Sequence, residues 1–148
     1  MRLTTYTDYT MRVLIYLGLQ QDHLVTISDI AQAYGISENH LMKVVHGLAQ
    51  RGDVETVRGK GGGMRLARKP EEINIGETIR ATEGEGGLLA CVESESDCCI
   101  QQACALIGIL KEAQTALYGV LDRYTLADLL QRDAPLTAIL MSMHRTSE

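Results

Sequence analysis

Residues 26–52 read TISDIAQAYGISENHLMKVVHGLAQRG, a pattern that predicts two helices joined by a short turn. Thr26 is placed to cap the first helix, with Asp29 three residues later completing a capping box. Gly35 is expected to end that helix, because glycine adopts the left-handed backbone conformation at little cost. Ser37 then caps the second helix. The arrangement is typical of a helix-turn-helix, in which the second helix lies in the major groove of DNA.

The second helix of this pair has an apolar side and a polar side. Its apolar positions recur at helical spacing and predict a buried stripe of Leu41, Val44, Val45 and Leu48. The opposite side carries Asn39, His40, Lys43 and Gln50. An asparagine can bond adenine through two atoms, and a lysine suits guanine or phosphate. The alternative is the exposed polar face of an ordinary helix pair. The residues of this helix expected to contact DNA are Ser37, Asn39, His40 and Lys43.

A glycine-rich hairpin is expected directly after this helix. Residues 54–58 and 64–66 have the pattern of two short strands around GKGGG at 59–63. A nucleotide-binding loop is excluded here, because no Gly-Lys-Ser/Thr sequence follows and no helix begins. The hairpin is therefore interpreted as a DNA-binding wing, whose glycines let the backbone approach the duplex closely. The residues of the wing expected to contact DNA are Arg58, Lys60 and Gly61.

Charge is distributed unevenly along the 148 residues. The net charge of −5 taken alone argues against a nucleic-acid partner, but residues 43–69 hold seven basic side chains against two acidic ones. That segment carries +5, which leaves −10 on the rest of the chain. A local positive field can bind phosphate even on an acidic protein. Accidental clustering on a solvated surface is the alternative that charge alone leaves open.

The composition is that of a soluble globular protein. With 45% apolar and 22% charged residues, the chain is not expected to be disordered throughout. The longest apolar run, residues 13–17, is far shorter than the roughly 20 residues that cross a bilayer. No cleavage site of small residues follows the N-terminal segment, so a signal peptide is not expected. We expect a cytoplasmic protein with no membrane partner.

A long amphipathic helix is expected from Cys104 onward. So small a chain offers no obvious partner for its apolar face, which favours a homodimer formed through it. The alternative is burial of this face in a monomeric core. Its apolar positions are Leu106, Ile109, Leu110, Ala113, Leu117, Val120 and Leu121.

The predicted fold class is mainly α, a winged helix-turn-helix with a two-stranded wing and a long dimerisation helix. The DNA-binding domain is expected over residues 1–83 and a cysteine loop over 84–104. The dimerisation helix and a following short helix are expected over 105–132, and a flexible tail over 133–148. The chain is not expected to be an enzyme.

All four cysteines fall within fourteen residues: Cys91, Cys98, Cys99 and Cys104. In a cytoplasmic chain, cysteines gathered in one loop favour metal binding over disulfides. The Cys-x-x-Cys knuckle typical of zinc sites is absent, as is simple ferredoxin spacing. Three of the cysteines could hold an iron–sulfur cluster, with a fourth ligand from outside the loop. Zinc, a thiol switch and inert thiols remain as alternatives, because soft thiolates suit zinc and iron–sulfur almost equally.

Four segments of the chain occur in the order found in one family of regulators. They are MRLTTYTDY at 1–9, RGKGGG at 58–63, the end of the cysteine loop at 98–104, and YTLADL at 124–129. Over residues 1–132 the chain resembles the winged-helix iron–sulfur repressors that include IscR and NsrR, and it looks closest to the NsrR type. The resemblance implies a homodimer with one cluster per subunit, 4Fe-4S or 2Fe-2S. It also implies that operator DNA is released when nitric oxide attacks the cluster.

The resemblance further implies which cysteines hold the cluster. The family spaces its last two cysteine ligands by five residues, which selects Cys98 and Cys104 in this sequence. Cys91 is then the first ligand, and Cys99 is left over.

A fourth ligand is implied in the same way. IscR-like members carry a histidine three residues after the last cysteine, where this chain has Ile107. In NsrR-like members an acidic residue near the N-terminus of the other subunit can serve, and Asp8 matches that position. The alternative for Asp8 is an acid favoured by the helix dipole and paired with Arg12 one turn later. A carboxylate is a weak, hard ligand for iron, which would leave that side of the cluster open to attack.

Together these features predict a dimeric winged-helix repressor whose iron–sulfur cluster senses nitric oxide. One alternative is a repressor of the same architecture that senses cluster supply or general redox state. A different class, an electron-transfer or redox protein, would need an exposed cluster and no specific DNA binding. The helix-turn-helix and the wing disfavour that class.

Overall fold

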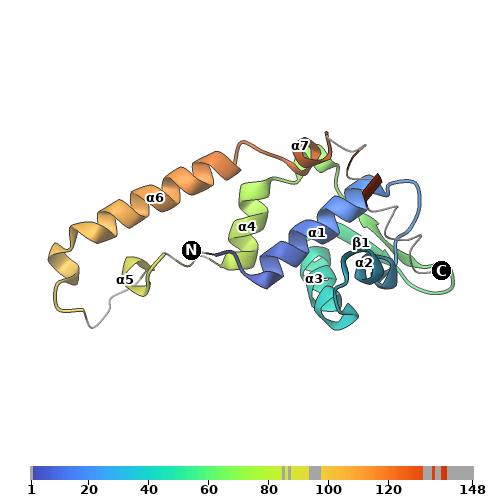
Figure 1. Ribbon diagram of the computed structural model, residues 1–148, viewed down its shortest axis with the longest axis horizontal. Helices are drawn as coiled ribbons and strands as arrows, with labels where there is room; N and C mark the ends of the chain where they lie inside the picture. The colour runs from blue at the N-terminus through green and yellow to red at the C-terminus, as the bar shows by residue number, and fades with distance from the viewer. Residues whose placement is uncertain are drawn as a thin grey trace.

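The computed structural model describes residues 2–84, 86, 88–93, 98–131, 135 and 138–139, which form a mainly helical chain with one two-stranded sheet (Figure 1). The predicted fold class is confirmed. The tail predicted over 133–148 lies outside the described residues, apart from 135, 138 and 139. The elements are α1 (Thr5–Leu19), α2 (Ile27–Tyr34), α3 (Glu38–Arg51), β1 (Val54–Val57), β2 (Gly63–Leu66), the 3-10 helix η1 (Pro70–Glu72), α4 (Ile75–Glu83), α5 (Ala90–Glu93), the 3-10 helix η2 (Gln101–Ala103), α6 (Ala105–Leu121) and α7 (Leu126–Leu130).

The two helices of the helix-turn-helix, α2 and α3, form where they are predicted. The hydroxyl of Thr26 accepts a hydrogen bond from the N–H of Asp29 (3.2 Å), and the Asp29 carboxylate accepts one from the N–H of Thr26 (2.8 Å). Gly35 ends α2 with a left-handed φ of 64°. Ser37 caps α3, and Gly52 ends it with a φ of 78°. All of these contacts join residues close in the chain, which is why the sequence predicts them.

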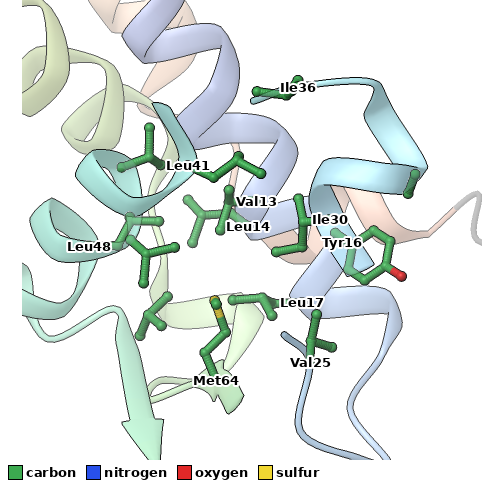
Figure 2. Close-up of a cluster of buried hydrophobic side chains, with 14 of the residues drawn as sticks. Val13, Leu14, Tyr16, Leu17, Val25, Ile30, Ile36, Leu41, Leu48 and Met64 are labelled. Carbon is green, nitrogen blue, oxygen red and sulfur yellow. The ribbon is translucent and has the colours of Figure 1, made fainter. Parts of the chain in front are cut away.

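The core lies where α1, α2, α3 and the hairpin meet, and α7 covers it (Figure 2). Helix α1 begins at Thr5, eight residues before its longest apolar run, residues 13–17. The reason is that the hydroxyl of Thr4 accepts a hydrogen bond from the N–H of Thr7 and caps a polar first turn. The stripe predicted on α3 is buried at every position: Leu41, Val44, Val45 and Leu48.

The hairpin is anchored at its base and exposed at its tip. Strands β1 and β2 pair antiparallel, with Val54 opposite Leu66. Val25, in the loop before α2, exchanges two backbone hydrogen bonds with Met64 (3.0 and 2.7 Å). The side chain of Met64 is buried in the core, whereas residues 58–61 are exposed. The wing therefore leaves the body from a fixed base.

Helices α6 and α7 pack differently, although the sequence groups them in one segment, 105–132. Helix α7 packs against α1 and η1, and Leu126 is fully buried in the core. Helix α6 has no buried residue, extends away from the body (Figure 1) and contacts α4 and α5. Burial of α6 in a monomeric core is therefore excluded. Within the described part of the chain, no helix combines the length and the apolar character needed to cross a membrane.

Candidate functional site

The N-terminal half of α3 presents the side chains predicted to contact DNA, and Ser37, Asn39, His40 and Lys43 are all exposed. The hydroxyl of Ser37 lies 3.0 Å from Nδ1 of His40, and the His40 ring tilts against Tyr9 of α1 with 6.0 Å between the ring centres. Neighbours therefore hold His40 in place. Asn39 and Lys43, by contrast, make no side-chain hydrogen bond or ion pair to any described residue. Their polar groups are available to a duplex.

Two further side chains share this exposed face of α3. Met42 is 50% exposed, and His46 is exposed one turn further on. Both follow Asn39 at spacings that place residues on one side of a helix, three and seven positions along. The sequence prediction includes neither of them. Their spacing from Asn39 was the signal that could have identified them. The apolar side chain of Met42 can contact the methyl group of thymine.

The tip of the wing needs glycine. Gly61 has a φ of 76°, in the region that side chains other than glycine rarely adopt. A Cβ on Gly62 would collide with the backbone carbonyl oxygen of Val57. The tight tip that results leaves the side chains of Arg58 and Lys60 exposed, together with the backbone of Gly61.

The basic segment, residues 43–69, contains basic side chains with an acidic partner and basic side chains without one. Three of its seven bases lie in ion pairs with acids: Arg51, Arg65 and Arg68. The other four have no ion pair among the described residues: Lys43, Arg58, Lys60 and Lys69. Three of these four lie on α3 or at the wing tip. The positive charge that can bind phosphate is thus concentrated on the two surfaces predicted to contact DNA.

Alanine substitutions should separate the two kinds of contact. We expect Arg58→Ala to weaken binding to every DNA sequence and to lower the salt dependence by about one unit of slope, because one phosphate contact is lost. We expect Asn39→Ala to cost roughly 1–3 kcal/mol on the specific site and little elsewhere, because it removes a base contact. Anisotropy titrations with a specific and a random duplex at several salt concentrations measure both effects. If both variants lose both kinds of binding equally, these roles are wrong.

The cysteine segment contains two short helices, where the sequence predicts a loop. Cys91 lies in α5, and Cys104 directly precedes α6, while Cys98 and Cys99 are exposed ahead of η2. The four cysteines form no disulfide. The segment folds back on itself, because the side-chain N–H of Gln101 donates to the carbonyl of Cys91 (3.1 Å).

The donors in this segment fit an iron–sulfur cluster by their chemistry, since thiolates are the usual ligands of such clusters. The described residues of one chain do not bring three Cys, His, Asp or Glu side chains close enough for a metal site. Asp8 lies apart from the segment, on the first turn of α1, where its carboxylate pairs with Arg12 at 3.0 Å. The cysteines thus share one segment, but a single chain does not gather all the predicted ligands.

A bidentate ion pair attaches the C-terminal end of α6 to α4. Arg80 donates to both carboxylate oxygens of Asp122 (2.8 and 2.6 Å), and its guanidinium lies over the ring of Tyr118, 4.3 Å from the ring centre. Their hydrogen bonds raise the pKa of Arg80 and lower the pKa of Asp122. Gly76 permits this approach, because a Cβ there would collide with the Asp122 carboxylate. Beside this ion pair, a groove of about 740 Å³ lies between α4 and α6.

The last residue of α4 holds the start of α1. The carboxylate of Glu83 accepts hydrogen bonds from the N–H of Thr4 (2.8 Å) and from the hydroxyls of Thr4 (2.9 Å) and Thr7. Burial raises the pKa of Glu83, but the hydrogen bonds from Thr7 and Thr4 outweigh it and leave the pKa below its ordinary value. Helix α4 is therefore tied both to α6 and to the turn of α1 that carries Asp8.

Known proteins resemble the chain over almost its whole length. Residues 3–132 match the model of the Rrf2 family, an iron-dependent transcriptional regulator. The HTH-type transcriptional regulator NsrR of Shouchella clausii is 47% identical over 142 residues, 95% of each chain, and NsrR of Bacillus subtilis is 46% identical over 95% of this chain and 97% of its own.

Solved structures share the fold. IscR of T. potens has a TM-score of 0.69 at 29% identity, covering 90% of this chain and 88% of its own. CymR, the global cysteine regulator of B. subtilis, has a TM-score of 0.66 at 28% identity, covering 87% and 95%. The family match extends over every element from α1 to α7.

Proposed function

Because the chain belongs to the Rrf2 family of transcriptional regulators, we propose that it is a repressor of the NsrR type, which senses nitric oxide through an iron–sulfur cluster and then releases its operator. The observation that carries the proposal is the place of Cys104, directly before the exposed helix α6. A group bound by the cysteines therefore fixes the start of α6, whose other end is joined to α4 by the ion pair of Asp122 and Arg80. Identity of 46–47% to regulators named NsrR supports the choice of signal.

The residues assigned to the cluster are Cys91, Cys98 and Cys104, with Asp8 of the partner subunit as the fourth ligand. When bound, the cluster supplies iron with which nitric oxide reacts. Three thiolates hold it to one segment of the chain, and a carboxylate is the weaker, more exchangeable donor. The Asp8 side chain is 50% exposed, so a second chain can reach it. Ile107 stands where IscR-like members carry a histidine, which leaves the fourth position to another residue.

The homodimer is assigned to α6. No residue of this helix is buried, and the side chains of Leu106, Ile109 and Val120 are 49%, 60% and 46% exposed. An apolar face of this kind marks an interaction surface. A second copy of the chain suits it, because a two-fold dimer presents two copies of α3 to two half-sites of a duplex.

Anaerobic purification tests the cluster and the dimer together. We expect a coloured protein with the mass of a dimer, containing iron and acid-labile sulfide in equal amounts and no zinc. Absorbance, elemental analysis and light scattering give the three measurements. A protein that binds one zinc per chain, or that carries no metal and still binds operator DNA at full affinity, would contradict the proposed sensor.

A further inference from the structure

Asp53 occupies the junction between the DNA-contacting helix and the wing. It lies between Gly52, which ends α3, and Val54, which begins β1. Its side chain is 1% exposed, and it is the only buried charged residue in the part of the chain that the structure describes. A buried carboxylate needs partners, because burial of an unpaired charge is strongly unfavourable.

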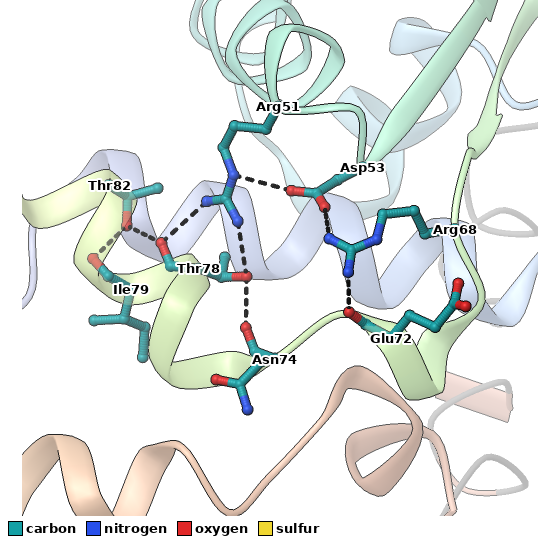
Figure 3. Close-up of polar contacts among 8 residues, drawn as sticks. All are labelled: Arg51, Asp53, Arg68, Glu72, Asn74, Thr78, Ile79 and Thr82. Carbon is teal, nitrogen blue, oxygen red and sulfur yellow. Dashed lines mark hydrogen bonds and ion pairs between the residues drawn. The ribbon is translucent and has the colours of Figure 1, made fainter.

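Two arginines from opposite ends of the wing bind this carboxylate (Figure 3). Nε of Arg51, the last residue of α3, lies 3.0 Å from Oδ2, and Nη1 of Arg68, just beyond β2, donates to Oδ1 at 3.1 Å. The backbone of Asp53 is held as well. Its N–H donates to the carbonyl of Leu48 in α3 (3.0 Å), and its carbonyl accepts from the N–H of Ala67 (2.9 Å). One residue thus connects the end of α3 with both ends of the hairpin.

The same arginines continue the network into the rest of the body. Arg51 donates to the carbonyl and the hydroxyl of Thr78 in α4, both at 3.4 Å, and Thr78 is itself fully buried. Arg68 donates to the carbonyl of Glu72 in η1. The hydrogen bonds from Arg68 are charge-assisted and directional, unlike apolar contacts, so they fix an angle as well as a distance. Arg51 and Oδ2 of Asp53 form an ion pair without hydrogen-bond geometry, so this contact contributes by charge and proximity. Figure 3 shows both guanidinium groups placed between the carboxylate and the neighbouring helices.

We propose that Asp53 is a positioning residue for DNA recognition, which holds the wing at one angle to α3 and keeps Arg51 and Arg68 from binding phosphate. The inference rests on the proposed DNA contacts of α3 and the wing tip. Those two surfaces must reach one duplex together, and both start from this junction. A small rotation there displaces Arg58 and Lys60 at the tip while the base contacts of α3 stay where they are.

The sign of the effect separates positioning from simple electrostatics. Asp53→Asn keeps the shape of the side chain and removes one negative charge, so charge alone predicts tighter binding to all DNA. Loss of positioning predicts the opposite for the specific site. The released arginines then bind phosphate in any sequence, which favours non-specific DNA. The wing and α3 no longer contact the duplex together, which weakens binding to the specific site. The ratio of specific to non-specific affinity is therefore the informative quantity.

Glu55→Gln is the matched control. It also removes one negative charge, two residues further along the chain, where Glu55 of β1 pairs with Arg65 and the two side chains are 45% and 59% exposed. The probes are a duplex that the wild-type protein selects from a random library and a shuffled duplex of the same composition. We expect Asp53→Asn to lower the affinity ratio on the order of tenfold or more, as for the loss of a good base contact. We expect Glu55→Gln to leave the ratio unchanged.

The titrations use the cluster-loaded protein, with the folded fraction measured by circular dichroism at the same temperature. A purely structural role for Asp53 would lower the melting temperature and the active fraction but not the affinity ratio of the folded molecules, and an unchanged ratio overturns the proposal. If Asp53→Asn does not fold, Arg68→Gln removes one arm of the network and must lower specific binding more than non-specific binding. Arg58→Ala on the same probes tests the interface itself. If it changes neither affinity, the proposed DNA contacts fail, whereas a wild-type ratio in Asp53→Asn alone rejects only the positioning role.

Discussion

Nitric oxide is expected to lower the operator affinity of the proposed cluster-loaded dimer about a hundredfold, because α4 connects α6, which follows the cysteine segment, to α1 and α3. Helix α4 is tied to α6 by Arg80 and Asp122, to α1 by Glu83, and to α3 by Arg51, which bonds Thr78. In the proposed dimer two copies of α3 would have to meet major grooves at a fixed separation, so a small rotation between subunits would spoil both contacts at once. A hundredfold change corresponds to about 2.7 kcal/mol, within the usual range of allosteric coupling.

An anaerobic titration of operator duplex, repeated after stepwise addition of nitric oxide, measures this loss against the cluster absorbance. Asp8→Ala tests the link between subunits, and we expect it to bind DNA less tightly before nitric oxide is added and to respond less afterwards. Asp22→Ala is the control, because it removes the same charge from an exposed position in the loop after α1. Tight binding that persists after the absorbance is fully bleached would exclude the sensing role. If Asp8→Ala responds as wild type does, the sensor remains and the link through Asp8 is wrong.

Replacing Cys91, Cys98 or Cys104 with alanine is expected to abolish cluster incorporation in each case, while Cys99→Ala retains it. In the proposed site each of the three would supply one of only three thiolates, so the loss of one would leave the cluster without a donor. Cys99→Ala is the matched control, since Cys98 and Cys99 are adjacent and both exposed. Iron and sulfide content and the visible absorbance, measured on protein purified without oxygen, report the result.

A cluster that survives in Cys98→Ala but is lost in Cys99→Ala would exchange the roles of these two residues. Full incorporation in all four variants would reject the thiolate site. Operator binding by the three cluster-free variants then indicates how much of the DNA affinity depends on the cluster, since their α3 helices and wings are unaltered.

The helix-turn-helix and the wing could be predicted because their signals act over a few residues. The hydroxyl of Thr26, the positive φ of Gly35 and the hydroxyl of Ser37 each act on backbone groups within one turn of helix. The buried stripe of α3 follows from helical period alone. The cysteine segment was recognisable for the same reason, since the spacing of its cysteines is a property of the chain.

Other features depend on which distant segments meet, and the sequence alone did not predict them. Leu126 belongs to the core of the DNA-binding body, although α6 separates it from that body in the chain. The Glu83 carboxylate accepts a hydrogen bond from the N–H of Thr4, the N-cap of α1, which lies 79 positions earlier. No local pattern predicts such contacts, because the partner is chosen by how whole elements pack against one another.

The basic segment, residues 43–69, shows most clearly which features follow from local sequence and which depend on the tertiary structure. Its sequence alone determined that a helix, a turn and a glycine-rich hairpin would carry an excess of positive charge next to the positions predicted to contact DNA. Only the tertiary structure decided which charges remain available, by burying Asp53 where the end of α3 meets the end of the hairpin and pairing it with Arg51 and Arg68. The physical reason is that a formal charge is fixed by residue type, whereas its partner and its exposure are fixed by the burial of groups that lie far apart in the chain.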